Sequence, residues 1–297
     1  MKKWYFIFSF TIIILVLSLT YYKNTTNPKV LSVYDENTSF FEKFIPLTPK
    51  AIRQRKFNEV IKRTKEKEGV YGIYIKEIGG SLKHTFNQDE LFYGASLYKI
   101  PLGAAALKEI ELGNKRSDEL VEIQGNDFED GTGSLNTLYP GVEIEYNQIL
   151  NTLLKESDNT AQNIFWRILP MDQIMAAFNI ITIKTYFYVN NTVTPTQIGN
   201  LFENIILGDY LSDVSKEILL NKMSITVFDD RVHKGLNEDI KFAHKIGNWP
   251  ETSSWHDCGI TVKDESKIVV CVMSRNTTYE DFLSVTKDVG EYVNILF

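Results

Sequence analysis

Strand-forming segments lie near both ends of this chain, and helix-forming segments fill its middle. Toward the N-terminus, the runs "VYGIYIKEI" and "LKHTF" flank Gly79-Gly80, a pattern typical of a β-hairpin. Toward the C-terminus, three further apolar runs have strand composition: "IKFAHKI", "WHDCGITV" and "KIVVCVMS". Because strands from both ends can pair in one antiparallel sheet, this order predicts an α+β fold in which the sheet packs against a helical lobe.

The helical segments have recognisable boundaries. A first helix is predicted from Pro49, which follows the capping residue Thr48, to Gly69. A second begins at Ser96 and is closed by Gly113. The remaining helices are predicted at 146–156, at 160–169, after positions 197 and 212, and after "NTTYEDFL". We expect a functional site in the cleft between the sheet and the helical lobe.

The first part of the chain differs from the rest. Met1-Lys2-Lys3 precedes a stretch from Trp4 to Tyr22 without a charged residue, and about 19 helical residues span a hydrocarbon core of roughly 30 Å. The stretch lacks an A-x-A cleavage pattern and ends in two tyrosines, which favours a transmembrane anchor over a cleaved signal. We expect a single-pass cell-membrane protein with its domain outside the cytoplasm, or a secreted protein if residues 1–22 are removed.

Composition indicates one folded domain after this segment. Residues 23–48 are rich in Asn, Thr and Pro and are interpreted as a linker, and residues 49–297 as the domain. Hydrophobic residues make up 43% of the chain and charged residues 24%, as in ordinary globular proteins. The net charge is −6 and no basic stripe is present, which excludes nucleic acid as the expected partner.

The two cysteines lie in neighbouring strand-like runs joined by "KDES". If these runs form a hairpin with Val262 opposite Lys267, then Cys258 lies directly opposite Cys271, because paired numbers have a constant sum along an antiparallel ladder. Directly opposed side chains are close enough for a disulfide, which an exported protein permits. The alternative is a pair of small buried thiols in the sheet. The sequence leaves both open.

The segment "YGASLYKIP" places Ser96 three residues before Lys99 at the start of a helix, on one helix face. A serine hydroxyl becomes a nucleophile when a base takes its proton, and a lysine serves as that base once its pKa is lowered. The pattern alone is weak evidence, because Ser284 and Lys287 repeat it in the last helix. Taken alone, Ser96 is also an ordinary helix cap.

Two other short motifs also have ordinary explanations when each stands alone. Ser157-Asp158-Asn159 lies between two helical segments, where all three residue types are favoured as caps. Lys245-Ile246-Gly247 ends a strand, where a lysine before a turn glycine is common. Their order in the chain is more informative, because S-x-x-K, S-D-N and a K-x-G strand together form the motif set of penicillin-binding proteins and class A β-lactamases.

From about residue 50 to 297 the chain therefore resembles the class A β-lactamase and serine-transpeptidase family. Further stretches agree with this resemblance: "GTGSL" at 131–135, "TVTPTQIGNLFENI" at 192–205 and "FAHKIGNWPETSSWHDCGITV". The resemblance implies that Ser96 is acylated, that Lys99 takes its proton, and that Ser157 passes a proton to the leaving amide nitrogen.

The same resemblance implies the substrate-binding residues. Asn159 would hold the amide side chain of the substrate, and Lys245 followed by Gly247 would bind its carboxylate and lead into the oxyanion hole. The implied substrates are β-lactams and cell-wall peptides ending in D-Ala-D-Ala. No metal or organic cofactor is implied. Ser-His-Asp catalysis through His244 or His256 with Asp257 is disfavoured, because Ser96 lacks the G-x-S-x-G elbow.

Two departures from the family pattern affect the expected activity. Ile246 stands where the family has Thr or Ser, so a hydroxyl that helps to bind the carboxylate is missing. Class A β-lactamases hydrolyse the acyl-enzyme with an Ω-loop glutamate, whereas residues 160–193 contain one acidic residue, Asp172, which is better explained as a helix-start residue. We therefore expect slow deacylation. The alternatives are a penicillin-binding D,D-peptidase, a β-lactam binder or sensor without turnover, and a degenerate structural domain.

Overall fold

The computed structural model describes residues 48–179 and 190–297. The chain divides by its contacts into Met1–Lys50 and Ala51–Phe297, and the description below concerns the second unit together with the start of its first helix. The expected anchor at 1–22 and the expected linker up to residue 47 lie outside the described residues. Within the described part, no helix is both long and apolar enough to cross a membrane.

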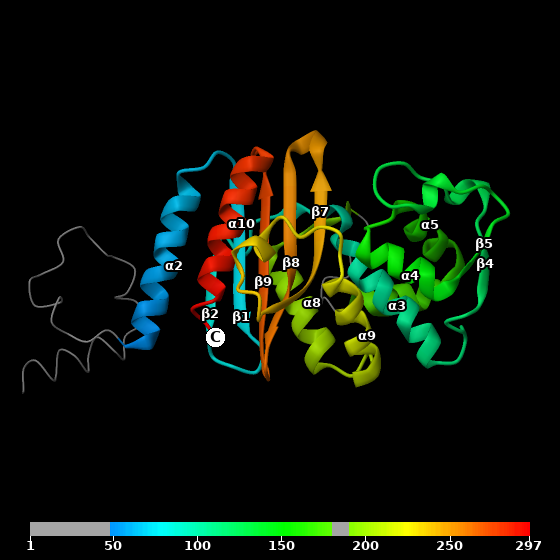
Figure 1. The fold of residues 1–297 in the computed structure, drawn as a ribbon, viewed down its shortest axis with the longest axis horizontal. Helices are drawn as coiled ribbons and strands as arrows, with labels where there is room; N and C mark the ends of the chain where they lie inside the picture. The colour runs from blue at the N-terminus through cyan, green and yellow to red at the C-terminus, as the bar shows by residue number, and fades with distance from the viewer. Residues whose placement is uncertain (1–47, 180–189) are drawn as a thin grey trace, which may run out of the picture. The chain divides into compact units, whose positions relative to one another are not determined.

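A five-stranded antiparallel sheet joins the two ends of the domain, as the sequence predicts (Figure 1). N-terminal strand β1 pairs with C-terminal strand β9, and this pairing unites the two sets of strands. From one edge to the other the strands are β2 (Lys83–Phe86), β1 (Val70–Glu77), β9 (Ser266–Arg275), β8 (Ser254–Lys263) and β7 (Lys241–Trp249).

Alternation along the strands divides the core into two layers. In β9, Val270 and Val272 belong to the cluster formed with helices α2 (Pro49–Lys65) and α10 (Tyr279–Val293). Val269 and Met273 belong to the cluster on the opposite face, which extends into the helical lobe. Successive side chains of a strand point to opposite faces, so each face of the sheet buries its own apolar set. In Figure 1, α2 and α10 stand on one side of the molecule and the lobe on the other.

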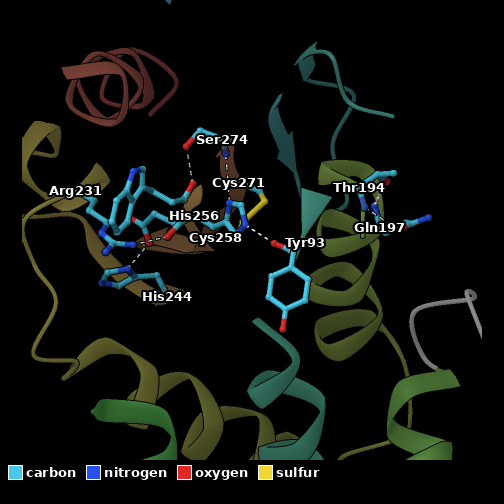
Figure 2. The surroundings of a disulfide bond; sticks show 11 residues. Tyr93, Thr194, Gln197, Arg231, His244, His256, Cys258, Cys271 and Ser274 are labelled. Atoms are coloured by element: carbon cyan, nitrogen blue, oxygen red, sulfur yellow. Dashed lines mark hydrogen bonds and ion pairs between the residues drawn. A yellow bond between two sulfur atoms is a disulfide. The ribbon is translucent and has the colours of Figure 1, made fainter. Parts of the chain in front are cut away.

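The helical lobe contains the central helices that the sequence predicts. Three helices begin with a side-chain cap: the side chains of Thr194, Ser212 and Thr278 each accept a backbone N–H from the first turn of their helix. Thr194 also forms a reciprocal capping box with Gln197 (Figure 2). The helices are α3 (Lys99–Glu111), α4 (Tyr146–Lys155), α5 (Asn159–Ile168), α6 (Met171–Asn179), α8 (Pro195–Leu207) and α9 (Asp213–Ser224).

Short elements connect and brace the larger ones. Two small antiparallel pairs are formed by β3 (Phe92–Tyr93) with β6 (Thr192–Val193) and by β4 (Leu120–Glu122) with β5 (Glu143–Glu145). The 3-10 turns are η2 (Ala95–Tyr98), η3 (Gly125–Asp127), η4 (Leu135–Thr137), η5 (Val232–Gly235) and η6 (Pro250–Thr252). The helix expected to begin at Ser96 thus begins with the tighter turn η2, and its α-helical part starts at Lys99.

The two cysteines form a disulfide. The predicted register is confirmed, with Val262 opposite Lys267 and Cys258 opposite Cys271. The sulfur atoms are bonded at 2.05 Å, and both residues are fully buried (Figure 2). Of the two alternatives that the sequence left open, the structure therefore contains the bridge. It joins β9, the central strand of the sheet, to β8, next in the ladder to Lys245, which pairs with Cys258 from β7.

Candidate active site

Ser96 is the second residue of η2 and is partly buried. The residue before it, Ala95, has a positive φ of 47°, a conformation that costs energy for a residue with a Cβ and persists where surrounding contacts impose it. Those contacts come from Asn191, whose carbonyl accepts the Gly94 N–H at 2.6 Å and whose side-chain amide donates to the Ala95 carbonyl at 2.9 Å. Asn191 therefore fixes the backbone before Ser96 through both its main chain and its side chain.

Lys99 follows one turn later as the first residue of α3, and its side chain is fully buried. Its Nζ donates to the carbonyl oxygen of Ser157 at 2.5 Å and to Oδ1 of Asn159 at 2.6 Å. Oγ of Ser157 lies 3.5 Å from the same amine. The fold thus brings the first motif against the second, from positions about 60 residues apart.

The second motif is held in an unusual backbone conformation. Ser157 has a positive φ of 59°, and it is almost completely buried. Asp158 caps α5: one carboxylate oxygen accepts the N–H of Ala161 at 2.8 Å, and the other accepts the N–H of Leu135 at 2.8 Å. Asn159 donates through its amide to the carbonyl of Asp130 at 2.8 Å. Asp158 therefore has a structural role that orients its two neighbours.

The "GTGSL" segment, residues 131–135, packs against this motif and holds its backbone in place. Oγ1 of Thr132 donates to the Ser157 carbonyl at 2.6 Å, and the Thr132 carbonyl accepts the N–H of Asn159 at 3.1 Å. Gly133 has a φ of 103°, and a Cβ there would lie 2.1 Å from the carboxylate of Asp158. This position therefore requires glycine for both its φ and its space.

The third motif reaches the same place from the sheet. Nζ of Lys245, on β7, donates to Oγ of Ser157 at 2.7 Å and to the carbonyl of Ile246 at 3.1 Å. A Cβ on Gly247 would lie 2.9 Å from the Gly94 carbonyl, so this strand passes directly against the segment that precedes Ser96. All six residues predicted from the sequence are thus placed in one region, where β7, η2 and the start of α5 meet.

Burial makes the two lysines unusual bases. It lowers the pKa of Lys99 to about 7, although the carboxylates of Asp158 and Glu129 oppose the shift. The pKa of Lys245 is lowered well below its ordinary value, because the amine is completely buried and because Lys99 and Arg231 add positive charge nearby. An amine with a pKa near 7 is neutral in a large fraction of molecules at neutral pH and can accept a proton.

His256 connects the sheet to the nucleophile segment, a contact that the sequence does not predict. Its Nδ1 accepts the backbone N–H of Ser274 at 3.3 Å, and its Nε2 lies 2.7 Å from the carbonyl oxygen of Tyr93 (Figure 2). Because an N–H can only donate and a carbonyl can only accept, the ring is neutral with its proton on Nε2. Burial lowers its pKa to about 4, which agrees with this tautomer.

Arg231 is a second residue that sequence reasoning missed. It is fully buried and donates to the His256 carbonyl at 2.6 Å (Figure 2). It also donates to Oδ1 of Asn248 at 2.7 Å. Its guanidinium also lies over the ring of Tyr279, 5.5 Å from the ring centroid. Arg231 therefore links the backbone of β8 to the Asn248 side chain of β7 and adds positive charge near Lys245.

The other histidine near the third motif has a structural environment. His244 is buried, stacks on Phe242 with ring centroids 4.3 Å apart, and its Nδ1 lies 2.6 Å from Oδ1 of Asp257. His244 and Asp257 therefore form a His-Asp pair, but the basic group that lies one turn from Ser96 is the amine of Lys99, not a histidine. In the described part of the chain, no group of three or more His, Cys, Asp or Glu residues could hold a metal ion.

The described residues include Ile246 and Asp172, the two positions that bear on the departures from the family pattern. Ile246 is buried and offers no hydroxyl beside Lys245. Asp172 is exposed in the first turn of α6, as expected for a residue that favours a helix start. Residues 180–189, between α6 and β6, lie outside the described residues, and the sequence contains no glutamate there.

Comparison with known proteins decides the family. The chain matches the β-lactamase enzyme family over residues 52–293. It belongs to that family. A comparison with curated protein sequences finds no match. As a member of the β-lactamase family, the protein is a serine hydrolase, and its fold is shared by many solved structures.

Three of the similar structures illustrate the range. A β-lactamase from Sphaerobacter thermophilus DSM 20745 is 19% identical, with a TM-score of 0.72 over 80% of this chain and 95% of that one. An ancestral class A β-lactamase is 21% identical, with a TM-score of 0.72 over 82% of this chain and 100% of that one. PBP-A is 20% identical, with a TM-score of 0.70 over 80% of this chain and 96% of that one.

Proposed function

We propose that the protein forms an acyl-enzyme at Ser96 with β-lactams or with cell-wall peptides of the D-Ala-D-Ala type, and that it releases the acyl group slowly. The observation that carries this proposal is the convergence of Lys99 and Lys245 on Oγ of Ser157, at 3.5 and 2.7 Å, one turn from Ser96. Two buried amines and a hydroxyl in this arrangement form a path for protons between a nucleophile and a leaving group.

Acylation follows from these positions. Neutral Lys99 takes the hydroxyl proton of Ser96 as Oγ attacks the carbonyl carbon of the substrate amide. The carbon–nitrogen bond then breaks, and Ser157 gives its hydroxyl proton to the departing nitrogen. Lys99, now charged, returns its proton to Ser157. The product is an ester at Ser96. The amine leaves when the substrate is a peptide and stays attached to the acyl group when a β-lactam ring opens, and both lysines end in their starting protonation states.

Substrate binding uses the remaining residues. Asn159 offers its side-chain amide to the amide group of the substrate, and Lys245 offers its amine to the carboxylate. The backbone N–H of Ser96 supplies half of an oxyanion hole, and the strand after Gly247 supplies the other half. The arrival of a carboxylate would raise the lowered pKa of Lys245 and favour its charged form.

Slow deacylation rests on the missing base. Asp172, the one acidic residue in the stretch that would contain the family's Ω-loop glutamate, is exposed on α6. Among the similar structures, a substituted form of PBP-A is described as an acyl-enzyme complex with penicillin G. A penicillin-binding D,D-peptidase, or a β-lactam sensor that stays acylated, therefore fits this chain as well as a weak β-lactamase does.

We place this chemistry outside the cytoplasm, on a single-pass membrane protein. The uncharged stretch from Trp4 to Tyr22 after two lysines supports an anchor with its N-terminus inside. The Cys258–Cys271 disulfide supports an oxidising compartment, because cytosolic proteins of most organisms keep their thiols reduced.

Labelling with a fluorescent penicillin tests the proposal. The full-length chain in detergent would be incubated with the probe, separated from the excess, and followed for loss of label, with Ser96→Ala as the control. Label that requires Ser96 and persists for hours is the expected result. Release within minutes would contradict slow deacylation, and the absence of Ser96-dependent label would overturn the β-lactam proposal.

A further inference from the structure

Two exposed aromatic rings lie on the two segments that carry Ser96 and Lys245. Tyr93 is 37% exposed and Trp249 is 38% exposed, and their ring centroids are 4.9 Å apart with an interplanar angle of 48°. Tyr93 precedes Ser96 by three residues, and Trp249 follows Gly247 by two residues on β7. The pair thus extends the site along the edge strand that carries Lys245.

Fixed backbone holds both rings in place. The Tyr93 carbonyl accepts the His256 ring N–H, while the Tyr93 ring points away from that histidine (Figure 2). Tyr93 also pairs with Thr192 across β3 and β6, and Trp249 pairs with Ser254 across β7 and β8. Because the backbone is ordered on both sides, the exposed ring area is preorganised and loses little entropy when another group packs on it.

The chemistry of the pair favours a neutral, flat, apolar group. Among the described residues, no lysine or arginine lies over either ring, in contrast to Tyr74, Phe86 and Phe92, which each carry such a cation. Aromatic faces that are open and paired at an angle offer edge-to-face and offset contacts to a third ring.

We propose that Tyr93 and Trp249 form a subsite for an aromatic acyl side chain of the substrate. This inference rests on the proposed function and specifies its substrate class: amides whose acyl group carries a ring, such as the benzyl group of penicillin G, are acylated faster than amides that lack one. The position fits, because the acyl side chain stays attached to the carbonyl carbon that Ser96 attacks. Tyr93 lies three residues before that serine, and β7, which carries Trp249, passes against Gly94 and Ala95 at Gly247.

The test compares two substrates that share one reactive ring. The second-order rate of acylation at Ser96 would be measured in the full-length chain for penicillin G and for the penicillin nucleus that has a free amine and no acyl side chain. We expect Trp249→Ala and Tyr93→Ala each to lower the preference for penicillin G by about tenfold, as the loss of an aromatic contact predicts. The rate with the nucleus should change by less than about twofold.

Two further variants complete the design. Trp249→Phe keeps a ring and should keep the preference within about threefold of the unaltered chain. Tyr139→Ala removes a tyrosine that is 75% exposed and lies before β5, and it should leave both rates unchanged.

Several outcomes would overturn the inference. An unaltered chain without preference for penicillin G would do so. Equal loss of both acylation rates in Trp249→Ala would also overturn it, because the rings would then support the site without contacting the acyl group. Unchanged rates in both alanine variants would overturn it as well, and would leave the pair as a contact for another protein. Absence of Ser96-dependent acylation by either compound is a different result, because it refutes the proposed function itself.

Discussion

The side-chain amine of Lys245 donates a hydrogen bond to the hydroxyl oxygen of Ser157 across 2.7 Å, although 88 positions separate the two residues. The amine of Lys99 approaches the same oxygen from α3 at 3.5 Å. Two ammonium groups so close together, and both buried, would repel each other, and Lys99 contributes to the lowered pKa of Lys245. The site therefore favours a state in which at least one amine is neutral, which is the state that a general base requires.

The first prediction concerns the pH dependence of acylation. Burial lowers the pKa of Lys99 to about 7, and only the neutral amine can take the Ser96 proton. The rate of labelling by penicillin should therefore rise with pH through about 7 and level off above it. Lys99→Arg, whose guanidinium stays protonated, should lose about a hundredfold or more. A rate that is flat from about pH 5 to 9 would argue against Lys99 as the base.

The second prediction restores the missing hydroxyl of the third motif. Ile246→Thr places a hydroxyl beside Lys245, and a hydrogen bond to a charged group contributes about 1.5–3 kcal/mol, so penicillin should acylate this variant about tenfold faster. Ile246→Val is the matched control, because valine has the shape of threonine without its donor. Equal rates for the two variants would show that the hydroxyl does not reach the carboxylate.

The third prediction tests the contact between the 131–135 segment and the second motif. Gly133→Ala places a methyl group 2.1 Å from the Asp158 carboxylate and should destabilise the fold by about 2 kcal/mol or more, with a loss of acylation. Gly141 has a similar φ of 90° but nothing within 4 Å, so Gly141→Ala should cost about 1 kcal/mol and leave acylation intact. Urea unfolding and the labelling rate separate the two effects, and equal behaviour of the two variants would contradict the assigned role.

Much of this architecture could be predicted from the sequence, because the patterns that specify it are local. Alternating apolar residues and a fixed pair sum gave the correct register between β8 and β9, including Cys258 opposite Cys271. Ser212 marked the start of α9 correctly, whereas α8 begins at Pro195, inside the "TPTQ" segment after which it was expected. The three motifs could be found because they occur in the family's order along the chain, even though sequence identity to the similar structures is only about a fifth.

What the sequence could not supply depends on contacts between distant residues. The bond from His256 to the Tyr93 carbonyl joins positions 163 apart, and no spacing rule reports it. The 3-10 turn at Ser96 is imposed by Asn191, which holds Ala95 in a positive φ. The choice between disulfide and thiols was likewise undecidable from spacing, because opposed positions suit both.

The last prediction follows from the buried, neutral ring of His256. Its folded-state pKa is about 4, whereas an unfolded histidine has a value of about 6.5. Between these values the unfolded chain binds more protons than the folded one, so stability falls as pH falls through this window. The contribution of His256 to the free energy of unfolding should decrease by about 2 kcal/mol between about pH 7.5 and pH 5.

His256→Gln retains a donor for the Tyr93 carbonyl but cannot titrate there. Urea unfolding at both pH values should therefore show the variant losing about 2 kcal/mol less than the unaltered chain. All other titrating groups are common to the two proteins, so parallel losses would mean that the ring is already charged, or solvent-accessible, in the folded state.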